Sequence, residues 1–486
     1  MGVLSGLKPA EVWKYFEEIC QIPRPSKKEE KIIEFLKQFG IKHKLNTKVD
    51  DVGNILICKP ATKGYEDRAT IVLQSHMDMV CEKNSDVDFN FETDAIQPYV
   101  DGNWVKAKGT TLGADDGIGV AAQLAILASD TIEHGHIECL FTVDEETGLS
   151  GAFALQPGFI TGKILLNLDS EDEGEVFIGC AGGIDTVATF EYKSKSVPSK
   201  NDTFQLKISG LKGGHSGDEI NKGLGNSNKI ATRFMLYATK HFEARIATFN
   251  GGNLRNAIPR EAVVIFVVPQ QHSAQLKEYA QIFTKEIKNE LQKTESNLEI
   301  ALTETDKVSS VINRKTQRAL LHSLQGVWHG VVEMSRDIEG LVETSTNLAA
   351  VKTLDNNKIL VTTSQRSSID SQRTNVAQTV ASVFKLAEAE VEHVGEYPGW
   401  QPNTESPILD ISVEAYKKLF GVEPVVRAIH AGLECGLFLE KYPDLDMISF
   451  GPTLRDVHSP DERIDIETTQ KFWDYLIEII QNAPKK

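Results

Sequence analysis

Side chains capable of acid–base or metal chemistry stand where short apolar runs end or where an apolar helix begins. They are His76 and Asp78, Asp115 and Asp116, Asp144 to Glu146, Asp169 and His458. Short runs rich in β-branched residues are typical of strands buried in a mainly parallel sheet. One acid after one strand would most often be a solvated loop residue. Because open α/β sheets bind ligands at the carboxyl ends of their strands, four such ends predict a shared site.

Two histidines and several carboxylates form a mixed nitrogen and oxygen donor set that suits zinc, cobalt or manganese. A closed structural zinc site needs four ligands, so the excess indicates two metals that share a bridging carboxylate. Such a pair polarises a carbonyl and generates hydroxide. The neighbours Glu145 and Glu146 point in opposite directions on an extended segment. One can therefore bind a metal while the other acts as general base, although a merely charged loop is the alternative.

The elements that would position these residues follow an α/β pattern. Apolar residues at helical spacing predict a helix that ends before Pro23, then a second helix that ends at Gly40. A further helix is expected at residues 117–129. The expected strands are residues 54–58, 70–73, 137–143, 164–168 and 447–450.

The pattern changes near residue 186 to alternating strands and long charged helices, and the first pattern resumes near Gly395. We therefore predict a catalytic domain formed by residues 1–185 and 391–486, interrupted by a domain at residues 186–390. Asn-Leu followed by a strand and a helix occurs at Asn253 and again at Asn347, which indicates an internal duplication of the inserted domain.

The composition narrows the class of protein. Among 486 residues, 52 are Lys or Arg and 69 are Asp or Glu, giving a formal charge of −17. This balance argues against a nucleic-acid partner, because phosphate binding requires a basic surface. The sparse cysteines and a charged N-terminal segment without a signal-peptide pattern favour a reducing cytoplasm, and no apolar stretch is long enough to cross a membrane.

Three motifs carry a resemblance to a known family. They are LQSHMDMVCEKN at 73–84, GTTLGADDGIG at 109–119 and DEETG at 144–148. With HAGLECG at 430–436 and DVHSP at 456–460, they closely resemble bacterial aminoacyl-histidine dipeptidases. That family belongs to the co-catalytic zinc exopeptidases, which include peptidase V, carnosinase, aminoacylase and carboxypeptidase G. The resemblance implies a three-layer α/β catalytic domain interrupted by an α+β lid domain.

The resemblance also implies a role for each metal-site residue. His76 and Asp169 match the terminal ligands of one metal, Glu146 and His458 match those of the other, and Asp115 matches the bridging ligand. The resemblance further implies a cis peptide bond between Asp115 and Asp116.

Two more residues of the catalytic domain match functional positions of the family. Glu145 matches the general base, and Asp78 matches the residue that orients the His76 ring. Two divalent ions per subunit are expected, with zinc as first choice and manganese or cobalt as alternatives.

Substrate contacts are expected from the lid and from one catalytic-domain loop. His215 in GGHSG matches a lid histidine that helps polarise the scissile carbonyl, and Asn256 and Arg366 match substrate contacts. Arginine suits a free α-carboxylate because it binds such a group with two parallel hydrogen bonds. Gly432 lies in a segment that resembles a substrate-binding loop, and Glu434 is a candidate contact for an amine or imidazole.

The expected activity is hydrolysis of Xaa-His and related dipeptides such as β-Ala-His. The enzyme is expected to be cytoplasmic, and the resemblance implies that it is a homodimer. The same metal site could serve an N-acyl amino acid deacylase or an aminotripeptidase. A two-metal phosphoesterase uses similar ligands, but the sequence offers no phosphate cradle. An inactive binding protein on the same fold is opposed by the intact Glu145 and the five matching ligand positions.

Overall fold

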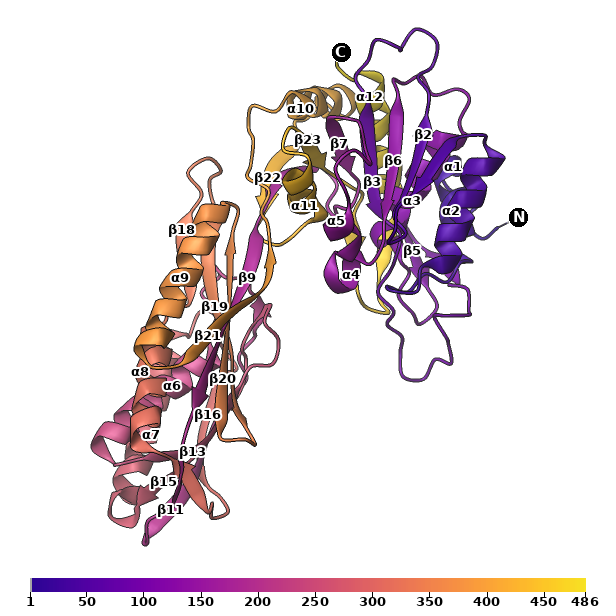
Figure 1. Cartoon of the computed structure of the whole chain (residues 1–486). Helices are drawn as coiled ribbons and strands as arrows, with labels where there is room; N and C mark the ends of the chain where they lie inside the picture. Colours follow the sequence, from indigo (N-terminus) through magenta and orange to yellow (C-terminus); the bar gives the residue numbers. More distant parts are fainter. Residues whose placement is uncertain (1) are drawn as a thin grey trace. The chain divides into compact units, whose positions relative to one another are not determined.

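A computed structural model describes residues 2–486 of the protein, which form two compact units (Figure 1). Unit 1 extends to Cys180 and resumes at Trp400–Ala428 and Leu433–Lys486, and unit 2 comprises Ala181–Gly399 and Ile429–Gly432. Unit 2 is longer at both ends than the range 186–390, because its strands extend past those limits. The four residues Ile429–Gly432 were not expected in unit 2.

Unit 1 is built on an eight-stranded mixed sheet whose four central strands are parallel. In spatial order its strands are β1 (Asn46–Val49), β2 (Ile55–Lys59), β6 (Ile137–Thr142), β3 (Ile71–His76), β7 (Ile164–Asn167), β23 (Asp446–Ser449), β8 (Glu175–Cys180) and β22 (Val425–Ile429). Every residue of β3, β6 and β7 is buried, as expected for strands covered on both faces. The predicted α/β fold class is confirmed.

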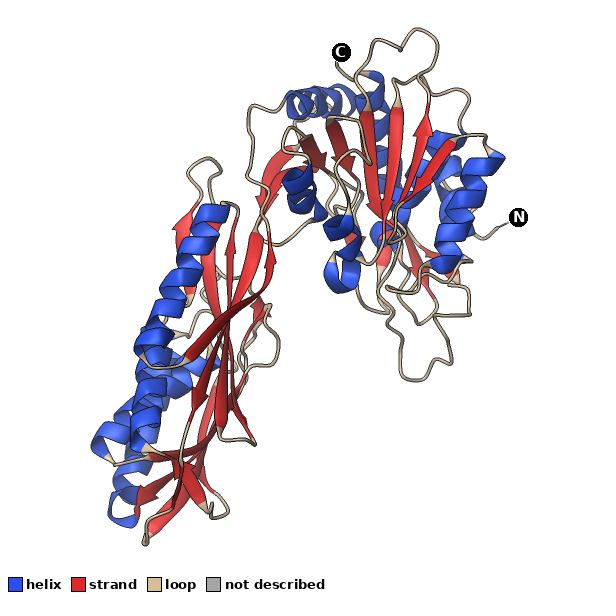
Figure 2. Ribbon diagram, in the orientation of Figure 1, coloured by secondary structure: helices blue, strands red, loops and turns tan. Residues whose placement is uncertain are grey.

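Helices cover the two faces of this sheet, which gives the three layers (Figure 2). They are α1 (Ala10–Cys20), α2 (Glu30–Lys42), α3 (Ala114–Ala128), α4 (Glu145–Gly148), α5 (Ser150–Ala154), α10 (Pro407–Phe420), α11 (Glu434–Lys441) and α12 (Ile466–Gln481). A small four-stranded sheet contains β24 (Leu454–Arg455), β25 (Arg463–Asp465), β5 (Trp104–Ala107) and β4 (Pro98–Asp101).

Unit 2 contains a nine-stranded antiparallel sheet. Its spatial order is β16 (Glu299–Glu304), β11 (Asn201–Ser209), β15 (Ala262–Pro269), β13 (Arg245–Gly251), β19 (Val342–Leu354), β20 (Lys358–Ser367), β9 (Gly182–Glu191) and β21 (Glu390–Tyr397), with β18 (Gly330–Met334) paired to β19. A four-stranded part that ends in β13 meets a five-stranded part where β13 pairs with β19. Short pairs are formed by β10 (Ser194–Ser196) with β17 (Ser310–Ile312), and by β12 (Gly214–His215) with β14 (Ala257–Ile258).

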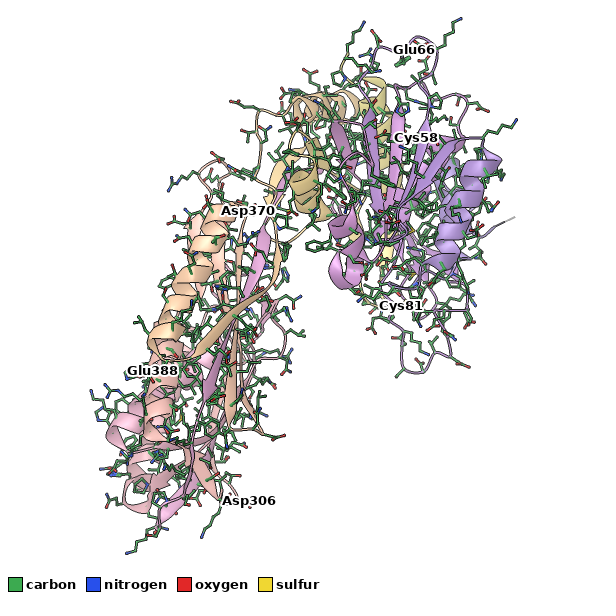
Figure 3. All side chains as sticks on the ribbon, viewed as in Figure 1. Cys58, Glu66, Cys81, Asp306, Asp370 and Glu388 are labelled. Atoms are coloured by element: carbon green, nitrogen blue, oxygen red, sulfur yellow. The ribbon has the colours of Figure 1, made fainter. Side chains whose placement is uncertain are left out.

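Four helices cover one face of the unit 2 sheet (Figure 2). They are α6 (Ser227–His241), α7 (Ser273–Glu290), α8 (Arg314–Gly326) and α9 (Asp370–Leu386). Asp370, labelled in Figure 3, begins α9 and accepts a hydrogen bond from Arg373 at 2.8 Å, and Glu388, also labelled there, lies two residues beyond the end of α9. Buried aromatic side chains such as Phe234 and Phe266 fill the core between helices and sheet, with ring centroids 6.2 Å apart.

The two ends of unit 1 that flank the inserted unit 2 are hydrogen-bonded to each other. Cys180 and Trp400 exchange backbone N–H···O hydrogen bonds of 2.9 Å in both directions. Cys58 and Cys81, labelled in Figure 3, are free thiols. Within residues 2–486, no helix is long and apolar enough to cross a membrane.

Candidate active site

His76 ends β3, and the chain then turns so that Asp78 lies beside its ring. Both side chains are buried, and His76 Nδ1 lies 3.3 Å from Asp78 Oδ1. Asp78 also accepts hydrogen bonds from the backbone N–H groups of Glu145 at 3.1 Å and Glu146 at 3.3 Å. Asp78 therefore fixes both the ring orientation of His76 and the backbone of Glu145 and Glu146. Carboxylates that do not bind the metal themselves commonly orient metal-binding imidazoles in this way.

Asp115 lies between the two histidines. Its Oδ1 is 3.1 Å from His76 Nε2, and its Oδ2 is 3.1 Å from His458 Nε2. His76 Nε2 is also 3.4 Å from Asp169 Oδ1, and His458 Nε2 is 3.0 Å from Glu146 Oε2. The structure thus brings the five residues together as two His–carboxylate groups that share Asp115.

The residues around Asp115 fit two divalent cations. Two ligand atoms bound about 2.0–2.1 Å from a tetrahedral ion are separated by roughly 3.3 Å, and the N···O distances of 3.0–3.4 Å are of this size. Glu146 Oε1 is buried without a hydrogen-bond partner among the described residues. The peptide bond between Asp115 and Asp116 is cis, as the resemblance implied.

The pKa values show how strongly these groups interact. Hydrogen bonds to Asp115 and Glu146 raise the pKa of His458 to about 11. Burial raises the pKa of Asp169 to about 7 against the opposing charge of His76. Burial also raises the pKa of Glu145 well above its ordinary value, again opposed by His76. Carboxylates held this close together are stabilised by bound cations, because each is costly to ionise beside the others.

Four of the expected substrate contacts belong to unit 2. His215, at the end of β12, has Nδ1 3.3 Å from Asp218 Oδ2. The carbonyl of Asn256 accepts a hydrogen bond from Ser216 N at 2.8 Å, so the β12–β14 pair holds His215 and Asn256 close together.

Arg366 and Gly432 meet at a residue that the sequence analysis missed. Arg366 is 7% exposed and donates a hydrogen bond to Tyr397 Oη at 2.9 Å. A Cβ atom at Gly432 would lie 2.8 Å from the Tyr397 ring, so a larger residue would collide with it. Tyr397 lies in a polar strand without a motif, and no sequence signal marked it.

Glu434 begins α11 and is 1% exposed. Its Oε2 accepts hydrogen bonds from Gln74 Nε2 at 2.6 Å and Thr142 Oγ1 at 2.9 Å. Burial raises its pKa to about 8, with the nearby charge of His76 acting in the opposite direction. Burial and these two hydrogen bonds therefore hold the side chain inside unit 1, rather than exposed at its surface.

Comparisons with known proteins agree with this geometry. Residues 72–482 match peptidase family M20/M25/M40. The cytosol non-specific dipeptidase of Escherichia coli (strain K12) is 44% identical over 486 residues, which cover 100% of both chains. The crystal structure of aminoacylhistidine dipeptidase from Vibrio alginolyticus is 46% identical with a TM-score of 0.92, covering 100% of this chain and 99% of that one.

A more distant similarity concerns the fold alone. The crystal structure of a tripeptidase from Staphylococcus aureus subsp. aureus Mu50 has a TM-score of 0.57 at 17% identity, covering 99% of each chain.

Proposed function

The chain belongs to peptidase family M20/M25/M40, and on that premise we propose that it is a metal-dependent dipeptidase that hydrolyses Xaa-His and related dipeptides. The observation that carries the proposal is the sharing of Asp115 between two His–carboxylate groups, with Glu145 beside them. Two proteins named as dipeptidases are 44% and 46% identical to this chain over its full length, which supports dipeptides as the substrate class.

The proposed metal ligands are those around Asp115. His76 and Asp169 would hold one ion, Glu146 and His458 the other, and Asp115 both. Zinc is the first choice because imidazole and carboxylate ligands suit it, and manganese or cobalt would also fit. Two divalent cations bound there would supply Lewis-acid polarisation of the scissile carbonyl and acidification of the attacking water.

Glu145 is proposed as the general base. Its carboxylate takes a proton from the attacking water and delivers it to the leaving amine nitrogen, while Asp78 holds the backbone N–H of Glu145 in place. A base buried among carboxylates needs the nearby cations to remain ionised at neutral pH, since burial raises its pKa.

The proposed substrate contacts lie in unit 2. Arg366 would bind the free carboxylate of the dipeptide, and Asn256 would also contact the substrate. His215 would polarise the scissile carbonyl, and Gly432 would line the binding loop. A closed site that must bind both charged ends of the substrate would favour dipeptides over longer peptides. Glu434 remains a candidate contact for the substrate amine, although its burial and its two hydrogen bonds favour a role inside unit 1.

A small substrate panel tests this proposal after chelation and add-back of zinc, manganese or cobalt. The panel contains β-Ala-His, Gly-His, Ala-Ala, Ala-Ala-Ala and N-acetyl-Met. Metal-dependent cleavage of β-Ala-His and Gly-His, with the tripeptide and the acetylated substrate spared, is the expected result. Cleavage of Ala-Ala-Ala or N-acetyl-Met instead would replace the proposal by an aminotripeptidase or a deacylase. Cleavage of none of them with metal restored would favour an inactive binding protein over an enzyme.

We further propose that the enzyme is a cytoplasmic homodimer in which His215 serves its own chain. Mixing Glu145→Ala with His215→Ala protein tests the second point. The mixture should stay inactive, whereas recovery of activity would place His215 in the site of a partner subunit.

A further inference from the structure

One buried carboxylate satisfies the backbone of the loop that delivers Asp115. Glu462 is 2% exposed, and its Oε2 accepts hydrogen bonds from the N–H groups of Leu112 at 2.7 Å and Gly113 at 2.9 Å. Its Oε1 accepts from Ala114 at 2.7 Å and from Asp115 itself at 3.4 Å. Four successive N–H groups converge on one charge, an arrangement that fixes a loop strongly because such hydrogen bonds are charge-assisted.

The carbonyl side of the same loop is held by a buried arginine. Arg24 is 2% exposed and donates hydrogen bonds to the carbonyl oxygens of Asp78 at 2.7 Å, Met77 at 3.2 Å and Gly113. Arg24 therefore ties the end of β3, which carries His76, to the loop that carries Asp115.

Glycine provides the space for this arginine. A Cβ atom at Gly113 or at Gly117 would lie 2.6 Å from an Arg24 guanidinium nitrogen. Gly113 also has φ +69°, a conformation that glycine adopts without strain.

Glu462 is also linked to the second histidine. It lies in the turn that follows His458, and its N–H donates to the carbonyl of Ser459 at 3.1 Å. Neither Glu462 nor Arg24 forms a salt bridge with another of residues 2–486. Burying unpaired charges is costly, so backbone groups must compensate both of them, and those groups all belong to segments that carry proposed metal ligands.

We propose that Glu462 and Arg24 are positioning residues that hold Asp115 at a fixed distance from His76 and His458 before any metal binds. The inference rests on the proposed function, since it concerns the same metal site. Glu462 fixes the Asp115 loop against the His458 loop, and Arg24 fixes it against the end of β3. The metal cage is then preformed, and no part of the binding free energy is spent on ordering these three segments.

The test measures zinc binding to the full-length, chelator-treated protein by isothermal titration calorimetry. Glu462→Gln keeps the size of the side chain but places an amide group among N–H donors. It should lower the affinity of at least one zinc site tenfold or more, about the size of effect known for outer residues of metal sites. Glu467→Gln makes the same chemical change at an exposed position in α12 and should leave the affinity unchanged.

A second measurement separates positioning from general stability. The absorption spectrum of the cobalt-loaded protein reports ligand geometry and should differ between Glu462→Gln and wild type, while circular dichroism stays the same. If Glu462→Gln does not fold, Glu462→Asp is tested by the same criteria. Its side chain keeps the charge but is one methylene shorter, so the carboxylate lies farther from the N–H groups of the Asp115 loop.

Wild-type zinc affinity and an unchanged cobalt spectrum in the folded variant would overturn this inference and leave the proposed function intact. A wild-type apoprotein that binds no zinc, manganese or cobalt would overturn the proposed function itself.

Discussion

Replacing Glu434 by glutamine should stabilise the metal-free protein, and the gain should grow as the pH rises from 4.5 to 8. Glu434 is fully buried, and burial raises its pKa from 4.5 to about 8, although hydrogen bonds from Thr142 and Gln74 act in the opposite direction. Between these values the folded protein retains a proton that the unfolded chain releases. Stability must therefore fall with rising pH, because the folded state binds more protons.

The size of the effect follows from the difference between the two pKa values. The difference is 8 − 4.5, or about 3.5 units. At about 1.4 kcal/mol per unit, it corresponds to an upper limit of about 5 kcal/mol at pH 8 and above. Glutamine stays neutral in both states, and its carbonyl can accept the hydrogen bonds from Gln74 and Thr142. The difference in stability between the variant and wild type should thus be near zero at pH 4.5 and widen toward this limit.

Urea unfolding followed by circular dichroism between pH 5 and pH 8.5 measures this difference. The protein is kept free of metal, because cations near Glu434 would change its pKa. Glu467→Gln is the matched control, since that side chain is exposed, and its stability difference should not vary with pH. A constant difference between Glu434→Gln and wild type across the range would refute the reasoning. Unchanged KM values for dipeptides in the metal-loaded variant would also argue against a substrate contact for its carboxylate.

Three further changes have distinct expected outcomes. Glu145→Gln should lower kcat by about 10²–10⁴-fold while zinc content measured by atomic absorption is retained, and loss of zinc would indicate a ligand instead of a base. Gly113→Ala should lower the unfolding free energy by about 1–3 kcal/mol, because its Cβ would meet Arg24 at 2.6 Å; Gly102→Ala has a similar φ and open space, and should cost less in the same urea titration. Arg366→Lys should raise KM for dipeptides about tenfold or more with a smaller effect on kcat, since lysine cannot bind a carboxylate with two parallel hydrogen bonds; an unchanged KM would contradict that role.

Local patterns in the sequence were sufficient for the elements of the fold. The apolar helix predicted at 117–129 matches the regular part of α3, because Asp115 and Asp116 near its start have non-helical dihedral angles. The order of strands was not predictable in this way. β7 pairs with β23, whose sequence lies far along the chain, and no local periodicity reports such a contact.

The candidate metal site was predictable for a physical reason. Carboxyl ends of parallel strands lie at one edge of a sheet. His76 ends β3 and Asp169 follows the neighbouring strand β7, so these two residues had to come close together. Their role as ligands stays a prediction. Arg24 and Glu462 could not be found in the same manner, because they bind backbone groups, which every sequence contains. The burial of Glu434 was equally hidden, since the glycine before it in HAGLECG is typical of an exposed loop.

The pairing of Cys180 with Trp400 bears on how such a chain could have been assembled. Because the host strands already meet where unit 2 begins and ends, a tight turn between these two residues would close unit 1 without altering its register. A gene for a single-unit ancestor could thus acquire or lose a long segment at this point in one step. Residues Ile429–Gly432 limit that modularity, since His430 bonds to Ser345 at 2.8 Å and would be left behind by a clean excision. Unit 2 therefore depends on four residues that the chain supplies only after it has returned to unit 1.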